Sequence, residues 1–187
     1  TLMRLALQHR DVTLWATANP STILELLRTL NENTEEMIQD IEHGTISDLF
    51  DIPYFIREEL YAYVSPKPER ADELRQILQE KGKLEPRDFW PWLQYLSTWK
   101  CGNTKIYMDK YMDQFDWDKT FYQELGYIAT ECRFGFSLDD TNESVLFPQF
   151  HYYEFVEESE LDSPHKNFLQ IYQLEQGKRY CAYVTTY

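Results

Sequence analysis

The sequence predicts an α/β fold in which a helical N-terminal half packs on a β-α-β unit, followed by antiparallel strands. Two observations lead to this prediction. Apolar residues recur at helical spacing through residues 1–86, and from residue 87 short apolar and alternating runs replace them. We therefore divide the chain into a mainly helical part, 1–86, and a mixed α/β part, 87–187, which together form one fragmentary domain.

The first helical segment covers residues 21–44. Leucine, isoleucine and methionine side chains follow one another at helical spacing, and Ser21 is the candidate N-cap. Gly44 suits the left-handed conformation that ends many helices. The pattern allows either one long helix or two helices with a break near residues 31–33.

Two further helices follow before the mixed part. Residues 46–64 form a candidate helix that Ser47 or Asp51 would cap, with a proline near its first turn. Residues 68–83 are amphipathic, and Gly82 would end this helix. Prolines between the two segments predict that they are separate helices.

The mixed part begins with a strand, a helix and a second strand. A short apolar run ends at residues 101–102, helical spacing follows over 103–115, and residues 120–130 have the pattern of a strand. This order predicts a parallel pair of strands with a right-handed crossover. Three more strands are predicted over 144–158, 168–176 and 179–187, the last two joined by a hairpin turn.

Composition excludes several classes of partner. The net charge of −14 argues against binding to nucleic-acid backbones and to anionic membrane surfaces. Three widely spaced cysteines without a CxxC pair indicate reduced thiols, and no stretch of 18 apolar residues occurs. We therefore expect a cytoplasmic protein that binds neither nucleic acid nor membrane and that acts on small molecules. The oligomeric state stays open.

Two strand ends carry groups that suit a nucleotide, because ligands of open α/β sheets bind beyond the carboxyl ends of the strands. Gly102 permits close backbone approach, and Asn103 then opens a helix whose free N–H groups favour an anion. At the second end, Thr130 can donate to a phosphate oxygen, and Glu131 can hold Mg²⁺ against a phosphate. Tyr127 can offer its ring face to a purine. The alternative is a helix N-cap formed by Thr130, with Glu131 in the first turn.

The stretch GYIATECRFGFSLD, residues 126–139, resembles the second nucleotide-binding motif of a known family. This is the Gretchen Hagen three (auxin-responsive promoter) family of acyl-acid amido synthetases, within the adenylate-forming superfamily. FPQFHYYEFVEE, residues 147–158, and GKRYCAYVTTY, residues 177–187, resemble two further segments of that family. A looser resemblance extends along most of the chain.

The resemblance implies that the chain is part of the large N-terminal domain of an adenylate-forming ligase that uses ATP and Mg²⁺. A carboxylic acid would attack the α-phosphate of ATP to give an acyl-AMP, which the amine of an amino acid would then attack. Thr130 would contact the α-phosphate, and Glu131 would bind Mg²⁺ or the phosphate. Tyr127 would pack on adenine, and Ala129 stands where many members carry serine.

The resemblance also assigns residues outside this motif. Gly102 and Asn103 would lie beside the nucleotide base. Tyr152 and Tyr153 would lie near the base or the acyl pocket, or would pack in the core.

Several parts of the family pattern are absent from these 187 residues. The Ser/Thr-Gly-rich phosphate loop is missing, and the third motif would begin just after Tyr187. We therefore expect an internal fragment that is inactive alone, from a parent protein that is an enzyme. The alternatives are a catalytically silent binding or scaffolding homologue, and a ligase similar to acyl-CoA synthetases with a thiol as acceptor.

Other catalytic chemistries have little support in the sequence. The histidines show no zinc-binding spacing, and Cys132 has no histidine or lysine at a diagnostic distance. We therefore expect an inert thiol at Cys132.

Overall fold

The computed structural model describes residues 1–49 and 51–186. It contains two compact units. Unit 1 consists of Thr1–Leu125 and Asp139–Asn142, and unit 2 of Gly126–Leu138 and Glu143–Tyr187. Phe50, in the predicted helical segment 46–64, and Tyr187, in the last predicted strand, lie outside the described residues. The boundary predicted at residue 86 separates a mainly helical part from a part with strands. The boundary between the two compact units lies elsewhere, after Leu125.

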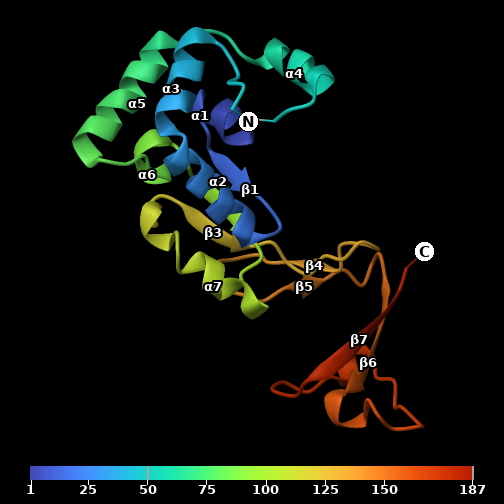
Figure 1. Cartoon of the computed structure of the whole chain (residues 1–187). Coiled ribbons are helices and arrows are strands. Elements are labelled where there is room, and N and C mark those ends of the chain that lie inside the picture. The colour runs from blue at the N-terminus through green and yellow to red at the C-terminus, as the bar shows by residue number, and fades with distance from the viewer. Residues whose placement is uncertain (50, 187) are drawn as a thin grey trace. The chain divides into compact units, whose positions relative to one another are not determined.

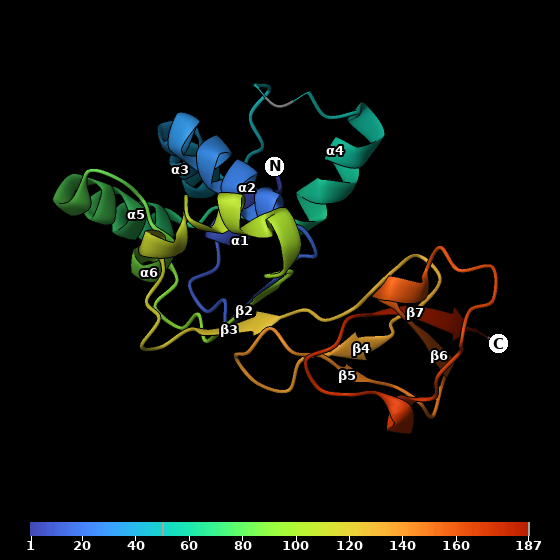
Figure 2. The same ribbon diagram turned by 90° about the horizontal axis from the view of Figure 1, so that it is seen from below.

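Unit 1 begins with a series of helices, which agrees with the mainly helical character predicted for residues 1–86. They are α1 Leu2–Leu7, α2 Pro20–Glu32, α3 Thr34–His43, α4 Tyr54–Leu60, α5 Pro68–Lys81 and α6 Pro86–Phe89. A 3-10 turn, η1 Tyr61–Tyr63, extends α4. Helices α3 and α5 run side by side (Figures 1 and 2). Among the described residues, no helix has both the length and the apolarity needed to span a bilayer.

The ends of these helices partly follow the prediction. Residues 21–44 form two helices, α2 and α3, which meet at Asn33. Gly44 and Gly82 end α3 and α5 in the left-handed conformation, with φ angles of 69° and 76°. The predicted cap Ser21 is wrong, because Asn19 caps α2 by accepting the N–H of Ser21. A proline at the first position then fixes the backbone for helix entry.

The predicted caps of α4 are also wrong. Pro53 occupies the N-cap position, and no side chain makes a capping hydrogen bond there. Ser47 instead donates its backbone N–H to the carboxylate of Asp40, and its hydroxyl accepts the N–H of Leu49. Helix α4 therefore begins without the side-chain support that the sequence predicts.

A parallel sheet of order β1-β2-β3 lies in unit 1. Its strands are β1 Leu14–Ala16, β2 Tyr95–Thr98 and β3 Phe121–Glu124. The connection from β2 to β3 contains α7 Lys105–Met108, flanked by the 3-10 turns η2 Gly102–Thr104 and η3 Met112–Gln114. The predicted β-α-β unit is therefore confirmed, although its helix and second strand are shorter than predicted. Strand β1 was not predicted, because three residues are too few to show an alternation.

The core of unit 1 joins the helices to the sheet. Buried side chains from α2, α3 and α5 form one cluster with Leu96 of β2 and Tyr122 of β3. This confirms the packing of the helical half on the β-α-β unit. Buried Arg4 donates to the backbone oxygens of Asp40 and Thr45. The guanidinium of this α1 residue thereby connects α1 with the end of α3 and the turn that follows it.

The described strands of unit 2 form two antiparallel ladders. One pairs β4 Gly135–Phe136 with β5 Val145–Leu146, and the other pairs β6 Tyr152–Glu157 with β7 Tyr180–Thr185 (Figure 2). Two 3-10 turns, η4 Glu158–Glu160 and η5 Ile171–Gln173, lie between β6 and β7. The predicted strand 168–176 is wrong: Leu169 makes one isolated bridge to Phe155, and η5 follows. Strand β7 pairs with β6 instead.

Candidate nucleotide-binding site

Thr130 and Glu131 lie at the tip of a tight hairpin in unit 2. Ile128 and Arg133 form an antiparallel bridge, and the N–H of Ala129 donates to the oxygen of Cys132 at 3.0 Å. Ala129, Thr130 and Glu131 are exposed. This placement corrects both interpretations from the sequence, since the two residues neither end a buried strand nor begin a helix.

Two glycines permit close packing at the base of this hairpin. Gly126 has a φ angle of 93°, and a Cβ atom there would lie 2.5 Å from the oxygen of Gly135. A Cβ atom on Gly135 would in turn lie 2.7 Å from the oxygen of Val145. The oxygen of Tyr127 accepts the N–H of Phe134 at 2.9 Å. Any side chain at Gly126 would therefore separate the hairpin from β4, and the predicted strand 120–130 stops before this residue.

The side-chain oxygen atoms at the hairpin tip are available to a ligand. Among the described residues, neither the Thr130 hydroxyl nor the Glu131 carboxylate has a hydrogen-bonding partner or salt bridge. Mg²⁺ keeps several waters and binds through one or two carboxylates together with substrate phosphates. Glu131 fits that pattern as a single protein ligand. Within the described chain, no cluster of three or more His, Cys, Asp or Glu residues could hold a metal ion by itself.

The cysteine beside the tip lacks the features of a nucleophile. Burial raises the pKa of the Cys132 thiol, and the charge of Glu131 raises it further. A raised pKa favours the neutral thiol, which is a poor nucleophile and a poor metal ligand. The side chain packs against the hydrophobic cluster of unit 2.

The three tyrosines of the predicted site differ in accessibility. Tyr127 is 49% exposed, and its ring centroid lies 4.8 Å from that of Phe134. Tyr152 is also exposed, and its hydroxyl accepts a hydrogen bond from Gln170. Tyr153 is 3% exposed and donates to the oxygen of Phe134 at 2.8 Å. Tyr127 and Tyr152 therefore present accessible rings, whereas Tyr153 is a core residue.

The other predicted site residues, Gly102 and Asn103, lie in unit 1. They are exposed and form the turn η2 with Thr104, whose hydroxyl donates to the oxygen of Cys101 at 2.8 Å. Gly102 has a φ angle of 69°, and no atom lies within 4 Å of the position a Cβ would take. Helix α7 has 4 residues, so the expected anion site at its N-terminus has little dipole behind it.

Two residues at the strand ends of unit 1 were not among the predicted site residues. Glu124, the last residue of β3, is 3% exposed and accepts the backbone N–H of Lys100 at 2.5 Å. The Lys100 ammonium group donates to the backbone oxygens of Tyr122 at 3.1 Å and Asp140 at 2.7 Å. An acid inside an otherwise strand-like run was the signal that could have identified Glu124.

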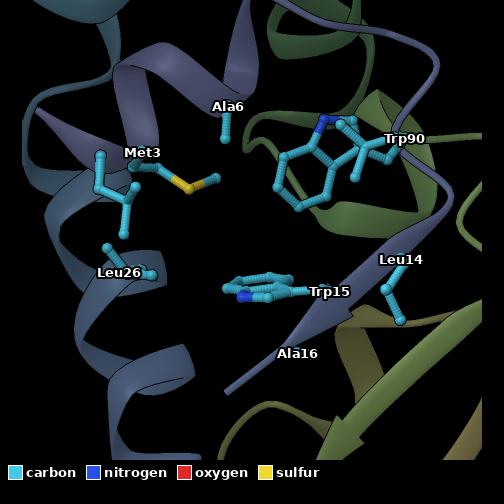
Figure 3. Close-up of a pocket in the computed structure, with 9 residues that line it drawn as sticks. Met3, Ala6, Leu14, Trp15, Ala16, Leu26 and Trp90 are labelled. Atoms are coloured by element: carbon cyan, nitrogen blue, oxygen red, sulfur yellow. The ribbon is translucent and has the colours of Figure 1, made fainter.

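An apolar pocket also opens in unit 1, with a volume of about 260 Å³ (Figure 3). Trp15 of β1 and Trp90 meet edge to face with ring centroids 5.3 Å apart, and Met3 and Leu26 line another part of the pocket. The lining residues carry no charge, so the pocket suits an apolar group and offers nothing to hold a phosphate.

Comparisons with known proteins agree with the resemblance seen in the sequence. The model of the GH3 family N-terminal domain matches residues 1–119, and that of the GH3 family central domain matches residues 144–187. The indole-3-acetic acid-amido synthetase GH3.8 of Oryza sativa subsp. indica is 28% identical over 96% of this chain and 31% of its own length. The indole-3-acetic acid-amido synthetase GH3.3 of Arabidopsis thaliana is 24% identical over 100% of this chain and 32% of its own length.

Solved structures support the same fold. A GH3.15 acyl acid amido synthetase superposes with a TM-score of 0.77 over 98% of this chain and 33% of that protein, at 19% identity. AtGH3.15 acyl acid amido synthetase in complex with 2,4-DB gives a TM-score of 0.76, at 20% identity over 98% of this chain and 33% of that one. This chain spans about a third of the length of the curated relatives it matches. Because the family's N-terminal domain model covers more than half of the sequence, the chain belongs to the GH3 family.

Proposed function

We propose that this chain is the central part of an ATP-dependent enzyme that joins a carboxylic acid to the amino group of an amino acid through an acyl-AMP intermediate. The observation that carries the proposal is the exposed hairpin tip, where a hydroxyl and a carboxylate lie on adjacent residues and no described residue forms a hydrogen bond with either. Membership of the GH3 family and the names of its relatives support this assignment.

The proposed roles of the hairpin residues are those that the family resemblance implies, and the chemistry of their side chains supports them. A carboxylate oxygen of the acid attacks the α-phosphorus of ATP, and the bond to the β-phosphate breaks to release pyrophosphate. The Thr130 hydroxyl donates to an α-phosphate oxygen, and Glu131 holds Mg²⁺. The chemistry that bound Mg²⁺ supplies is neutralisation of the charge that builds on the phosphate oxygens. The exposed ring of Tyr127 packs on adenine.

The second step transfers the acyl group. The amine nitrogen attacks the acyl carbon, the bond to the phosphate oxygen of AMP breaks, and the nitrogen loses a proton. The relatives named indole-3-acetic acid-amido synthetases and the relative in complex with 2,4-DB suggest an acid with an apolar body as substrate. Gly102, Asn103 and Tyr152 are proposed to border the nucleotide, and the reaction is proposed to take place in the cytoplasm.

The test uses the full-length protein that contains this chain. The variant Glu131→Gln keeps the size of the side chain and removes the charge. We expect acid-dependent exchange between ATP and pyrophosphate to fall about 10²–10³-fold, as when one electrostatic contact to a reacting group is removed. The matched control, Glu58→Gln, changes an exposed glutamate of α4 and should leave exchange unchanged.

The choice of acceptor separates the remaining alternatives. Amide formation with amino acids is expected, whereas thioester formation with CoA would indicate a ligase similar to acyl-CoA synthetases. A parent protein that binds an acyl-AMP analogue but catalyses no exchange would be a silent homologue. Unchanged turnover in Glu131→Gln would show that the role given to this carboxylate is wrong. The 187-residue chain alone is expected to release no pyrophosphate.

A further inference from the structure

The hairpin segment Gly126–Leu138 is bounded on both sides by residues of unit 1. The chain leaves unit 1 after Leu125 and belongs to it again at Asp139–Asn142. The mobility of the hairpin segment therefore depends on how firmly these two chain ends are held.

One residue contacts both chain ends. The backbone N–H of Lys100 donates to the Glu124 carboxylate, two residues before the segment begins. Its ammonium group donates to the oxygen of Asp140, two residues after the segment ends. The same ammonium also donates to the oxygen of Tyr122 and lies 5.0 Å from the centroid of that ring. Backbone and side chain of Lys100 thus connect the end of β3 with the returning loop.

Burial strengthens the Glu124 side of this connection. The Glu124 side chain is 3% exposed, and a carboxylate in such a place must be hydrogen-bonded to avoid a large desolvation cost. Hydrogen bonds from a charged ammonium group to carbonyl oxygens are stronger than neutral ones. A further contact supports the loop, because the Cys101 thiol donates to the oxygen of Asn142 at 3.7 Å.

We propose that Lys100 is a positioning residue for adenylate formation: with Glu124 it forms a clip that holds both ends of the hairpin segment and so limits the mobility of the segment that carries Thr130 and Glu131. The inference rests on the proposed function and adds to it a residue outside the resembling motif. Lys100 contacts neither substrate nor metal in this scheme. It acts only through the two residues at the hairpin tip.

A purely structural role is the competing explanation. In that case Lys100 would stabilise unit 1 without affecting the reaction. The two roles differ in what they change: a positioning residue affects turnover of bound substrates, and its function is restored by another cation that can donate to two carbonyl oxygens. Arginine has this capacity, whereas methionine retains the aliphatic stem alone.

The experiment compares Lys100→Met and Lys100→Arg with Lys110→Met in the full-length protein. Lys110 is an exposed lysine of the same connection between β2 and β3, so it is a matched control. Amide hydrogen exchange of residues 126–142 reports on the clip, and exchange between ATP and pyrophosphate reports on the reaction. We expect Lys100→Met to accelerate amide exchange and to lower kcat, each by about tenfold, with an unchanged KM for the acid.

The variant Lys100→Arg should recover most of both losses, and Lys110→Met should behave as the unsubstituted protein. If near-ultraviolet circular dichroism shows that Lys100→Met is unfolded, Lys100→Gln replaces it, because its amide can still donate to one carbonyl oxygen. Unchanged amide exchange in the Lys100 variants would overturn the proposal. Faster amide exchange with an unchanged kcat would also overturn it, since the clip would then be structural only.

Failure of the proposed function is recognised separately. If the proposed function is wrong, the unsubstituted protein will show no turnover. Amide exchange can then still be measured, and it reports whether the clip holds the hairpin segment. Accelerated amide exchange in Lys100→Met would then support the clip, and unchanged exchange would refute it.

Discussion

The two units differ in what holds them together. The core of unit 1 runs from Met3 to Tyr122 and includes side chains of its helices and its sheet. The corresponding cluster of unit 2 has Phe134, Tyr153 and Phe155 as its buried members. Unit 2 instead depends on the paired backbones of β6 and β7 and on the close contacts at Gly126. The residues proposed to bind nucleotide phosphate thus lie in the unit with the smaller core.

This difference suggests that unit 1 supplies most of the stability and that unit 2 opens locally more easily. Regions with few buried apolar contacts open locally at low free-energy cost, and binding segments are often found among them. All five tryptophans, Trp15, Trp90, Trp92, Trp99 and Trp117, belong to unit 1. Within these 187 residues, tryptophan fluorescence therefore reports on the unfolding of unit 1, while amide exchange can follow unit 2, so the two can be measured separately.

The largest expected effect is the loss of a core side chain in unit 1. Phe89 is 0% exposed, and its ring centroid lies 4.8 Å from that of Trp90. The change Phe89→Ala should lower the free energy of unfolding of unit 1 by about 3–5 kcal/mol, because it leaves a cavity. Urea denaturation followed by tryptophan fluorescence measures this. The control Phe55→Ala removes a ring that is 67% exposed and should change stability by less than about 0.5 kcal/mol.

A smaller effect is expected at a backbone contact of unit 2. In Gly126→Ala the new Cβ would lie 2.5 Å from the Gly135 oxygen, and the φ angle is 93°. Strain and overpacking together should cost about 2–4 kcal/mol, seen as faster amide exchange over residues 126–138. Gly177→Ala is the control, since Gly177 has a φ angle of 86° and no atom within 4 Å of the added position. Equal losses at both glycines would contradict the importance of the close contact.

The smallest effect concerns pH and unit 1. Burial raises the pKa of the Glu73 carboxyl group, but the hydrogen bonds and charges of Arg70 and Arg10 outweigh it and hold this pKa below its usual value. A carboxyl group with a lowered pKa stabilises the folded state above its unfolded pKa, and this contribution is lost as pH falls through the folded pKa. The urea midpoint of unit 1 should therefore decline below about pH 4.5.

The variant Glu73→Gln isolates this contribution. Without this carboxylate, the free energy of unfolding that unit 1 loses on acidification should be smaller by less than about 1 kcal/mol. The effect is small because the ion pairs of Glu73 are partly exposed. Glu69→Gln changes an exposed glutamate on the same helix and is the matched control. An identical pH dependence in both variants would mean that the salt bridges of Glu73 contribute nothing.

Much of the fold was predictable because it follows from local rules. Helical spacing located α2, α3 and α5, and the glycines at their ends marked where two of them stop. The alternation of strand, helix and strand predicted the parallel pairing of β2 with β3. Strand β1 and the pairing of β7 with β6 were beyond reach, since both depend on partners far away in the sequence.

The candidate site was predictable in residue type but not in geometry. The residues Thr130 and Glu131 follow an apolar run, which predicted a long strand, yet the glycine at position 126 ends β3 earlier and a hairpin follows. The contact between Lys100 and Glu124 joins residues 24 positions apart, so no local sequence pattern predicts it. Burial decided the role of Tyr153, which shares its residue type with exposed Tyr152.

Residues Asp139–Asn142 belong to unit 1 although they follow a segment of unit 2, and this affects how a gene for unit 1 alone must be designed. A stop codon placed after Leu125 would remove the carbonyl acceptors that Asp140 and Asn142 supply to unit 1. Unit 1 is therefore not encoded by one uninterrupted stretch of codons, and an excised version needs a grafted linker that carries the returning loop.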